Sequence, residues 1–153
     1  MLHDLLKIKR IREKSAQDTV RKVRYRLEQA MIEVDQKKEE LRTYIDWRKQ
    51  EERGLYDNII NAQVHQHDLD FLKQRIARMR EHDLVLEEAI RKAESFVEEV
   101  REELQQAEDA LRLAMQAVKK FEEFTQVLDE EEAKEKAYKE EQELEEFNPK
   151  NRH

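Results

Sequence analysis

The residues that could bind a metal ion or carry acid–base chemistry gather in one short stretch a little before the midpoint of the chain. His65, His67, Asp68 and Asp70 all lie between residues 65 and 70. On a helix, Asp68 would lie one turn after His65, which is a tolerable ligand spacing, but His65 and His67 would point to different faces. We therefore interpret the group as polar residues near a turn, and we predict no metal site.

No other motif in the sequence indicates catalysis. There is no P-loop, no glycine-rich phosphate cradle and no nucleophile motif, although carboxylates are abundant. An active site also needs preorganised groups that are shielded from water. The chain contains no cysteine, so disulfide and thiolate chemistry are excluded. We predict that the protein is not an enzyme and binds no cofactor.

The composition limits the fold that could position any functional side chain. The chain has 153 residues, of which 44% are charged, with one glycine and one proline. Turns depend on Gly, Pro, Asn and Asp, so the chain can reverse direction only once or twice. High charge with few helix breakers fits either a disordered chain or long helices.

Hydrophobic periodicity favours long helices. Apolar residues recur at alternating steps of three and four, interrupted by Asp83 and Thr125 in the second series and by Lys37 and Arg48 in the first. This pattern predicts a left-handed coiled coil, in which a buried polar residue such as Asp83 can fix the register. The second series is Leu69, Leu72, Ile76, Met79, Asp83, Leu86, Ile90, Ala93, Val97, Val100, Leu104, Ala107, Leu111, Ala114, Val118, Phe121, Thr125 and Leu128; the first is Val20, Val23, Leu27, Ala30, Val34, Lys37, Leu41, Tyr44 and Arg48. Leu2, Leu5, Leu6, Ile8 and Ile11 add a front stripe in a different phase.

The turn is expected in the segment DNIIN, because Asn58 and Asn61 tolerate left-handed backbone and Gly54 loosens the end of the first helix. Asn61 is a candidate N-cap for the second helix. We predict an all-α fold of two long helices in an antiparallel coiled-coil hairpin. It forms a single domain over residues 1–153, with helix one at about 3–57, the turn at about 58–62, helix two at about 63–146 and a frayed acidic tail at about 130–153.

Charge supports the antiparallel arrangement. The front of the chain is basic, and the segment after residue 122 is acidic. A hairpin brings these segments to the same end, where they attract each other, although exposed ion pairs select an arrangement more than they stabilise it.

The start, MLHDLLKIKRIREK, has no uninterrupted apolar core, and no stretch is long and apolar enough to span a membrane. We therefore expect a cytoplasmic protein without direct membrane insertion.

A basic stretch, RKVRYR, ahead of a heptad repeat is also typical of bZIP proteins, which bind DNA. The net charge of −7 and the acidic tail beside that stretch argue against this function. We predict no nucleic-acid binding.

Two surfaces could bind a protein partner. Aromatic and arginine side chains concentrate near the turn, as interface anchors do, and Trp47 lies off the seam and is hard to bury. This group consists of Leu41, Tyr44, Trp47, Arg48, Leu55 and Tyr56, with Phe71, Leu72, Ile76 and Met79 facing them. The alternative is that large residues simply plug the closed end of the hairpin. The second surface is an apolar stripe beside the seam, Val85, Ala89, Phe96, Ala110, Leu113, Ala117 and Phe124; its alternative is a wide core stripe, or cover by the front of helix one.

The chain resembles the FliJ and YscO families, the small stalk proteins of flagellar and virulence-type bacterial type III secretion systems. The segment LRTYIDWRKQEERGLYDNI is especially similar to YscO. The resemblance implies paired termini in the pore of a hexameric secretion ATPase, a turn near the cytoplasmic ring of the export gate, and contact with export chaperones. It also implies a monomer on its own, located in the cytoplasm at the inner face of the inner membrane.

Carried over to single residues, the resemblance implies ATPase contacts by the basic front, Lys7, Arg10, Arg12 and Lys14. For the gate it implies the group Leu41, Tyr44, Trp47 and Arg48, together with Leu69, Leu72, Ile76 and Met79 on the second helix. Trp47-Arg48 matches the Tyr-Arg pair of flagellar members, but Glu51 occupies the place of a further Tyr. The His that ends the family's patch corresponds to Met79 or His82. These departures favour the virulence branch.

Two other functions stay open. One is a structural scaffold that dimerises through the apolar stripe Phe96, Leu113 and Phe124. The other is a chaperone-escort hairpin that does not contact an ATPase.

Overall fold

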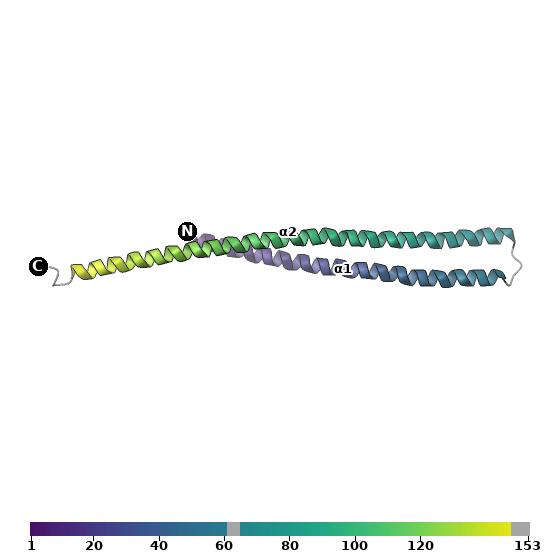
Figure 1. The fold of residues 1–153 in the computed structure, drawn as a ribbon, viewed down its shortest axis with the longest axis horizontal. Helices are drawn as coiled ribbons and strands as arrows, with labels where there is room; N and C mark the ends of the chain where they lie inside the picture. The colour runs from purple at the N-terminus through teal and green to yellow at the C-terminus, as the bar shows by residue number, and fades with distance from the viewer. Residues whose placement is uncertain (61–64, 148–153) are drawn as a thin grey trace. The chain divides into compact units, whose positions relative to one another are not determined.

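Two long helices make up the part of the chain that the structure, a computed structural model, describes, residues 1–60 and 65–147 (Figure 1). Helix α1 spans Leu2–Ile60 and helix α2 spans Gln66–Glu146, with no strand among these residues. The chain divides into two compact units, and α1 runs antiparallel to α2 in each of them. The predicted fold class, an all-α antiparallel hairpin, is confirmed.

The unit that contains the turn comprises residues 22–105. Its pairing is fixed by contacts such as Arg26 to Glu103 at one end and Tyr44 to Met79 nearer the turn. Two small clusters form its core, one of Ala30, Val34 and Val97 with Leu27 and Ala93 packed against it, the other of Leu72, Ile76 and Met79 with Leu55 and Ile59. Burial of these apolar side chains stabilises the pair of helices.

The other unit comprises residues 1–21 and 106–153, of which the structure describes the residues up to 147. His3 contacts Asp129 and Arg10 contacts Glu122, so the front of α1 lies against residues 122–129 of α2. From Glu130 to Glu146, α2 continues as a helix whose residues are all exposed. We expected this tail to fray or to stand alone; it is helical up to Glu146, and Pro149 lies outside the described residues.

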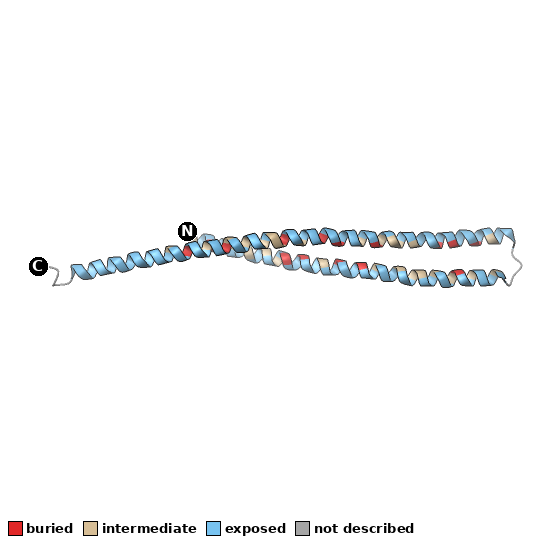
Figure 2. Cartoon of the chain, viewed as in Figure 1, coloured by how far each residue is buried: buried red, intermediate tan, exposed pale blue. Residues whose placement is uncertain are grey.

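The heptad seam forms the line of contact between the helices, as predicted (Figure 2). Every position of both predicted series, from Val20 to Arg48 and from Leu69 to Leu128, is buried or half-buried. Val100 is the most completely enclosed of them, with no exposed surface. The polar seam residue Thr125 is 5% exposed, and its hydroxyl donates a hydrogen bond to the carbonyl oxygen of Glu122 at 2.9 Å.

The front of α1 follows the same seam and not a second phase, which corrects the expectation for the front stripe. Leu6 is buried, while Leu5, Ile8 and Ile11 are exposed. The seam runs from Leu2 through Leu6, Lys9, Glu13 and Ala16 to Val20, all buried or half-buried. The sequence concealed this phase because two of its positions are charged.

The end of α1 lies later than the sequence suggested. Gly54 lies inside the helix, with no atom within 4 Å of a side chain added there, and no described residue has a positive φ. Helix α2 begins after His65, whose N–H donates to the Asp68 carboxylate at 3.4 Å, one half of a capping box. Asn61, the expected cap, lies outside the described residues. None of the described helical segments combines the length and the apolar character needed to cross a membrane.

Candidate functional site

An ion pair occupies the seam where the heptad pattern predicts apolar side chains. Arg48 of α1 and Asp83 of α2 face each other, and the guanidinium contacts both carboxylate oxygens, at 3.1 Å from Nε and 2.9 Å from Nη2. The Arg48 side chain is 12% exposed and that of Asp83 is 15% exposed. This two-point contact fixes one register of the helices, the role predicted for Asp83.

Glu52 extends this pair into a cluster of four charges. It accepts a hydrogen bond from Arg48 Nη1 at 3.1 Å, and Arg80 of α2 donates to both its oxygens, at 3.2 and 3.4 Å. Glu52 is only 8% exposed because the seam advances here by two successive steps of four residues, from Tyr44 to Arg48 and on to Glu52. Such a stutter locally unwinds the supercoil and brings an extra side chain into the contact line. The ionic cluster below means Arg48, Glu52, Arg80 and Asp83.

Three residues of the ionic cluster, Glu52, Arg48 and Arg80, have shifted pKa values. The hydrogen bond from Arg80, helped by that from Arg48, lowers the pKa of Glu52 even though burial opposes this. Burial alone would lower the pKa of Arg48, but the hydrogen bonds to Asp83 and Glu52 outweigh it and raise that pKa. The hydrogen bond to Glu52 also raises the pKa of Arg80. These hydrogen bonds therefore favour the charged forms of Glu52, Arg48 and Arg80.

Tyr44 borders the ionic cluster and links it to an exposed aromatic residue. Its hydroxyl donates to the Met79 carbonyl at 2.9 Å, and its ring lies 4.7 Å from that of His82 in an edge-to-face arrangement. Burial, followed by the negative charge of Asp83, raises the pKa of the Tyr44 hydroxyl. On the other side its ring lies 5.6 Å from that of Trp47. Tyr44 is thus held by backbone and ring contacts at once.

Trp47 is 49% exposed, as its position off the seam predicts. It lies at one end of an open groove along α1 whose other lining residues are Gln36, Glu39, Glu40, Thr43 and Tyr44. An exposed indole fixed by a half-buried neighbour loses little conformational freedom on binding, which is why such residues serve as interface anchors.

The apolar residues expected beside Trp47 lie mostly inside the hairpin. Leu72, Ile76 and Met79 are buried, while Leu41 and Leu69 are half-buried. Leu72, Ile76 and Met79 form the core cluster near the turn with Leu55 and Ile59, so these three fill the closed end of the hairpin. Their contact with a partner stays a prediction. The large apolar surface exposed near the turn belongs instead to Tyr56, Ile60 and Phe71.

The four basic residues expected to contact an ATPase, Lys7, Arg10, Arg12 and Lys14, are all exposed. Arg10 pairs with Glu122 at 3.4 Å, whereas Lys7, Arg12 and Lys14 have no ion-pair partner among the described residues.

Three side chains of the expected apolar stripe are exposed. In the unit that contains the turn, Phe96 is 43% exposed; in the other unit, Leu113 is 62% exposed and Phe124 is 46% exposed. Neither a wide core nor the front of α1 covers these three side chains.

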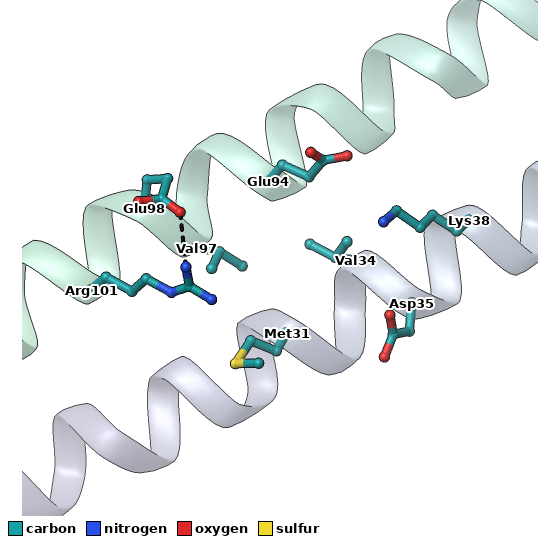
Figure 3. A pocket seen from close by; sticks show the side chains of 8 residues that line it. All are labelled: Met31, Val34, Asp35, Lys38, Glu94, Val97, Glu98 and Arg101. Carbon is teal, nitrogen blue, oxygen red and sulfur yellow. Dashed lines mark hydrogen bonds and ion pairs between the residues drawn. The ribbon is translucent and has the colours of Figure 1, made fainter.

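A second groove lies over the Ala30 cluster, with Val34 and Val97 at its floor (Figure 3). Its rim carries charges of both signs, Asp35, Lys38, Glu94, Glu98 and Arg101, and Arg101 pairs with Glu98 at 3.2 Å (Figure 3). A rim of mixed sign selects no ionic ligand, and nothing in the groove suggests chemistry.

His65, His67, Asp68 and Asp70 are exposed, and no metal-binding group of three such side chains exists among the described residues.

Sequence reasoning missed Glu52 and Arg80. A signal was present, because Glu52 lies four residues after Arg48, the spacing at which helical side chains meet. The partner on α2 could not be identified without the register of the two helices.

Comparison with known proteins identifies a relationship over almost the whole length. Residues 2–150 match the family described as Type III secretion protein YscO. A 2.8 Å crystal structure of Type III secretion protein YscO from Vibrio parahaemolyticus superposes with a TM-score of 0.88. It is 28% identical in sequence, and the match covers 97% of this chain and 93% of that chain. No curated protein matches the sequence.

Proposed function

This chain belongs to the YscO family of type III secretion proteins, and on that basis we propose that it is the central stalk of a bacterial type III secretion export apparatus. In this role it links the hexameric secretion ATPase to the cytoplasmic ring of the export gate, and it escorts export chaperones for reuse. The observation that carries the proposal is the family match over residues 2–150. Its place of action would be the cytoplasm, at the inner face of the inner membrane.

The unit that contains the N-terminus supports an ATPase contact at this end. Its front carries exposed basic side chains, Lys7, Arg12 and Lys14, that are free to meet acidic groups of another protein. Arg10, in contrast, is engaged by Glu122 within the chain. Exposed charges of one sign steer association and select partners more than they add affinity. We therefore assign Lys7, Arg12 and Lys14 the larger share of this contact.

The unit that contains the turn supports a gate contact through Trp47. Trp47 is a large exposed side chain, and its ring lies 5.6 Å from that of Tyr44, which borders the ionic cluster. Because the cluster fixes the register of α1 against α2, it also fixes where Trp47 points. We assign Trp47 as the anchor for the gate and Tyr44 as the residue that positions it.

The ATPase half of the proposal is tested by deletion. We expect the full chain to stimulate hydrolysis of ATP by the purified hexameric ATPase, and variants that lack residues 1–12 and 130–153 to lose this stimulation. A variant in which Lys7, Arg12 and Lys14 are replaced by Gln keeps the helices intact and serves as the finer test. If stimulation survives both changes, the ATPase contact does not lie at the termini.

The gate half is tested by secretion in a bacterium that depends on this chain. Trp47→Ala should abolish or strongly reduce secretion while stimulation of the ATPase in vitro is retained. Tyr25→Ala, which removes an exposed aromatic side chain elsewhere on α1, is the matched control and should leave secretion unchanged. Equal effects of the two substitutions would show that Trp47 is not a specific anchor.

Two outcomes would favour the other functions. A pull-down in which the chain captures export chaperones but never the ATPase would indicate an escort hairpin alone. A micromolar dimer in sedimentation that Phe96→Glu disrupts would indicate a scaffold that associates through the exposed stripe.

A further inference from the structure

Apolar packing alone does not choose one register for α1 against α2 in the unit of residues 22–105. The described seam positions of this unit are apolar or aromatic except for Lys37 and three members of the ionic cluster. Lys37 pairs with Glu40 of its own helix at 3.6 Å, so this contact does not depend on the register. Because α2 keeps one heptad phase, sliding it by seven residues, about 10 Å, would bring apolar seam residues opposite α1 again.

Two other contacts between the helices discriminate weakly between registers. The Tyr44 hydroxyl donates to the backbone carbonyl of Met79, and every residue of a helix has such a carbonyl. Arg26 and Glu103 form an ion pair, but both side chains are about half exposed, and exposed pairs contribute little. The choice of register therefore depends on the charges buried in the seam.

The contact between Arg48 and Asp83 opposes displacement in both directions. In the observed register the guanidinium contacts both carboxylate oxygens, and the two side chains are 12% and 15% exposed. Sliding α2 by one heptad would bring Ile76 opposite Arg48 in one direction, which we call the minus register, and Ile90 in the other, the plus register. Both isoleucines are buried and offer no partner to a charge.

Asp83 would lose its partner in the same two registers. Leu41 would lie opposite it in the minus register and Leu55 in the plus register, and both leucines are half-buried seam residues. Each displaced register would therefore leave two charges in the seam without partners. Removing the partner of a buried charge is strongly unfavourable, so this one pair opposes both displacements.

Glu52, in contrast, opposes displacement in one direction only. Its partner on α2 is Arg80, which directly follows a seam residue. The minus register would replace Arg80 by Lys73, another cation, whereas the plus register would replace it by the anion Glu87. The pair of Arg48 and Asp83 is therefore the contact in the ionic cluster that opposes the minus register.

We propose that Arg48 and Asp83 form a register-selecting pair, which excludes the minus register and adds little to stability. Polar residues in a seam can fix the register of coiled coils, and replacing a whole buried pair by apolar residues is often neutral or stabilising. The consequence for the gate contact rests on the proposed function. In the minus register Arg75 would take the place of His82, whose ring lies 4.7 Å from that of Tyr44, so the surroundings of Trp47 would change.

The registers can be distinguished by pairs of cysteines, because the native chain contains none. Arg26→Cys with Glu103→Cys reports the observed register, in which these side chains are 2.6 Å apart. Arg26→Cys with Phe96→Cys reports the minus register, and Glu33→Cys with Glu103→Cys reports the plus register. Each pair is treated with a short bis-maleimide crosslinker in the full chain, and crosslinks within one chain are counted.

The proposal is tested in the double variant Arg48→Leu with Asp83→Leu. We expect the yield of the minus pair to rise at least about fivefold over its yield in the chain with native seam residues, while the plus pair stays low. Urea denaturation and circular dichroism should show that the double variant remains helical and stable. The matched control is Arg48→Lys, which keeps a cation opposite Asp83 and should leave the minus pair at its low yield, although it is less stable than the double variant.

The proposal is overturned if the double variant gives no increase of the minus pair, or if Arg48→Lys gives the same increase. An equal increase of the plus pair would overturn the direction assigned to Glu52. Secretion provides a separate readout and should fall at least about fivefold in the double variant, because only part of the chains would then present Trp47 in its native surroundings. If the minus register forms and secretion is unchanged, register selection is supported and the assignment of Trp47 to the gate is wrong.

Discussion

Replacing Arg48 by leucine should destabilise the protein far more than removing an exposed arginine. Arg48 is the shared partner of Asp83 and Glu52, and its side chain is 12% exposed. Without it, the Asp83 carboxylate loses its partner in the seam, whereas Glu52 keeps the two hydrogen bonds from Arg80. Breaking a fully buried ion pair costs about 3–5 kcal/mol. Because water can reach Asp83 at the edge of a two-helix contact, we expect Arg48→Leu to lower the free energy of unfolding by about 2–3 kcal/mol.

The double variant Arg48→Leu with Asp83→Leu distinguishes an uncompensated charge from lost packing. It places an apolar side chain at both facing seam positions and leaves Glu52 paired with Arg80. Apolar replacement of a whole buried pair is often neutral or stabilising, so we expect the double variant to unfold within about 1 kcal/mol of the native chain. The coupling energy of the cycle would then be about 2 kcal/mol or more.

Urea denaturation followed by circular dichroism gives these free energies, with Arg26→Leu as the control. Arg26 contacts Glu103 at 2.6 Å, a shorter distance than any in the ionic cluster, but the two side chains are 49% and 46% exposed. An exposed pair contributes about 0–1 kcal/mol, so the control should cost little. The reasoning is refuted if Arg48→Leu costs no more than Arg26→Leu, or if the double variant loses as much as the two single variants together.

Three further predictions concern stability. Gly54→Ala should raise the free energy of unfolding, measured by urea denaturation, by about 0.5–1 kcal/mol, because Gly54 lies inside α1 in open space and alanine has the higher helix propensity. A loss of stability would contradict the position of Gly54 inside the helix. The pKa of Glu52 is lowered in the fold, so the stability that its charge contributes is complete above the ordinary pKa of 4.5 and is lost as the pH falls through the lowered pKa. The Tm advantage of the native chain over Glu52→Gln should therefore shrink in that acidic range. A Tm advantage independent of pH would be the opposing result. Val100→Ala should lower the Tm and cost about 2 kcal/mol, because Val100 has no exposed surface, whereas the same change at the exposed Val127 should cost well under 1 kcal/mol.

The arrangement of the seam could be predicted from the sequence because heptad periodicity is a local property of each helix. Residues 69–128 keep one phase with two interruptions, and all of the series lies in the contact line. The front of α1 could not be predicted in the same way. Lys9 and Glu13 occupy half-buried seam positions there. Long charged side chains can bury their aliphatic stems at such positions, so a hydrophobic pattern gives the wrong phase.

The ionic cluster could be predicted only in part. Asp83 stood out as a polar residue in the apolar series of the second helix. Arg48, which faces it, is the last position of the series in the first helix. Glu52 and Arg80 depend on the register between two segments far apart in the sequence and on the stutter after Arg48. No property of either helix alone specifies that pairing. Trp47 was recognised because a large residue off the seam is hard to bury in a two-helix contact, which is a geometric argument.

The most direct test of the account is whether one chain adopts a single antiparallel register, since the ionic cluster depends on it. The chain contains no cysteine, so cysteines can be introduced in pairs without background. With a short bis-maleimide crosslinker, the variant Arg26→Cys with Glu103→Cys should crosslink within one chain. The pair Glu33→Cys with Glu103→Cys, displaced by one heptad within the same unit, should react poorly. Equal crosslinking of both pairs, or crosslinks between two chains, would contradict the register and the account built on it.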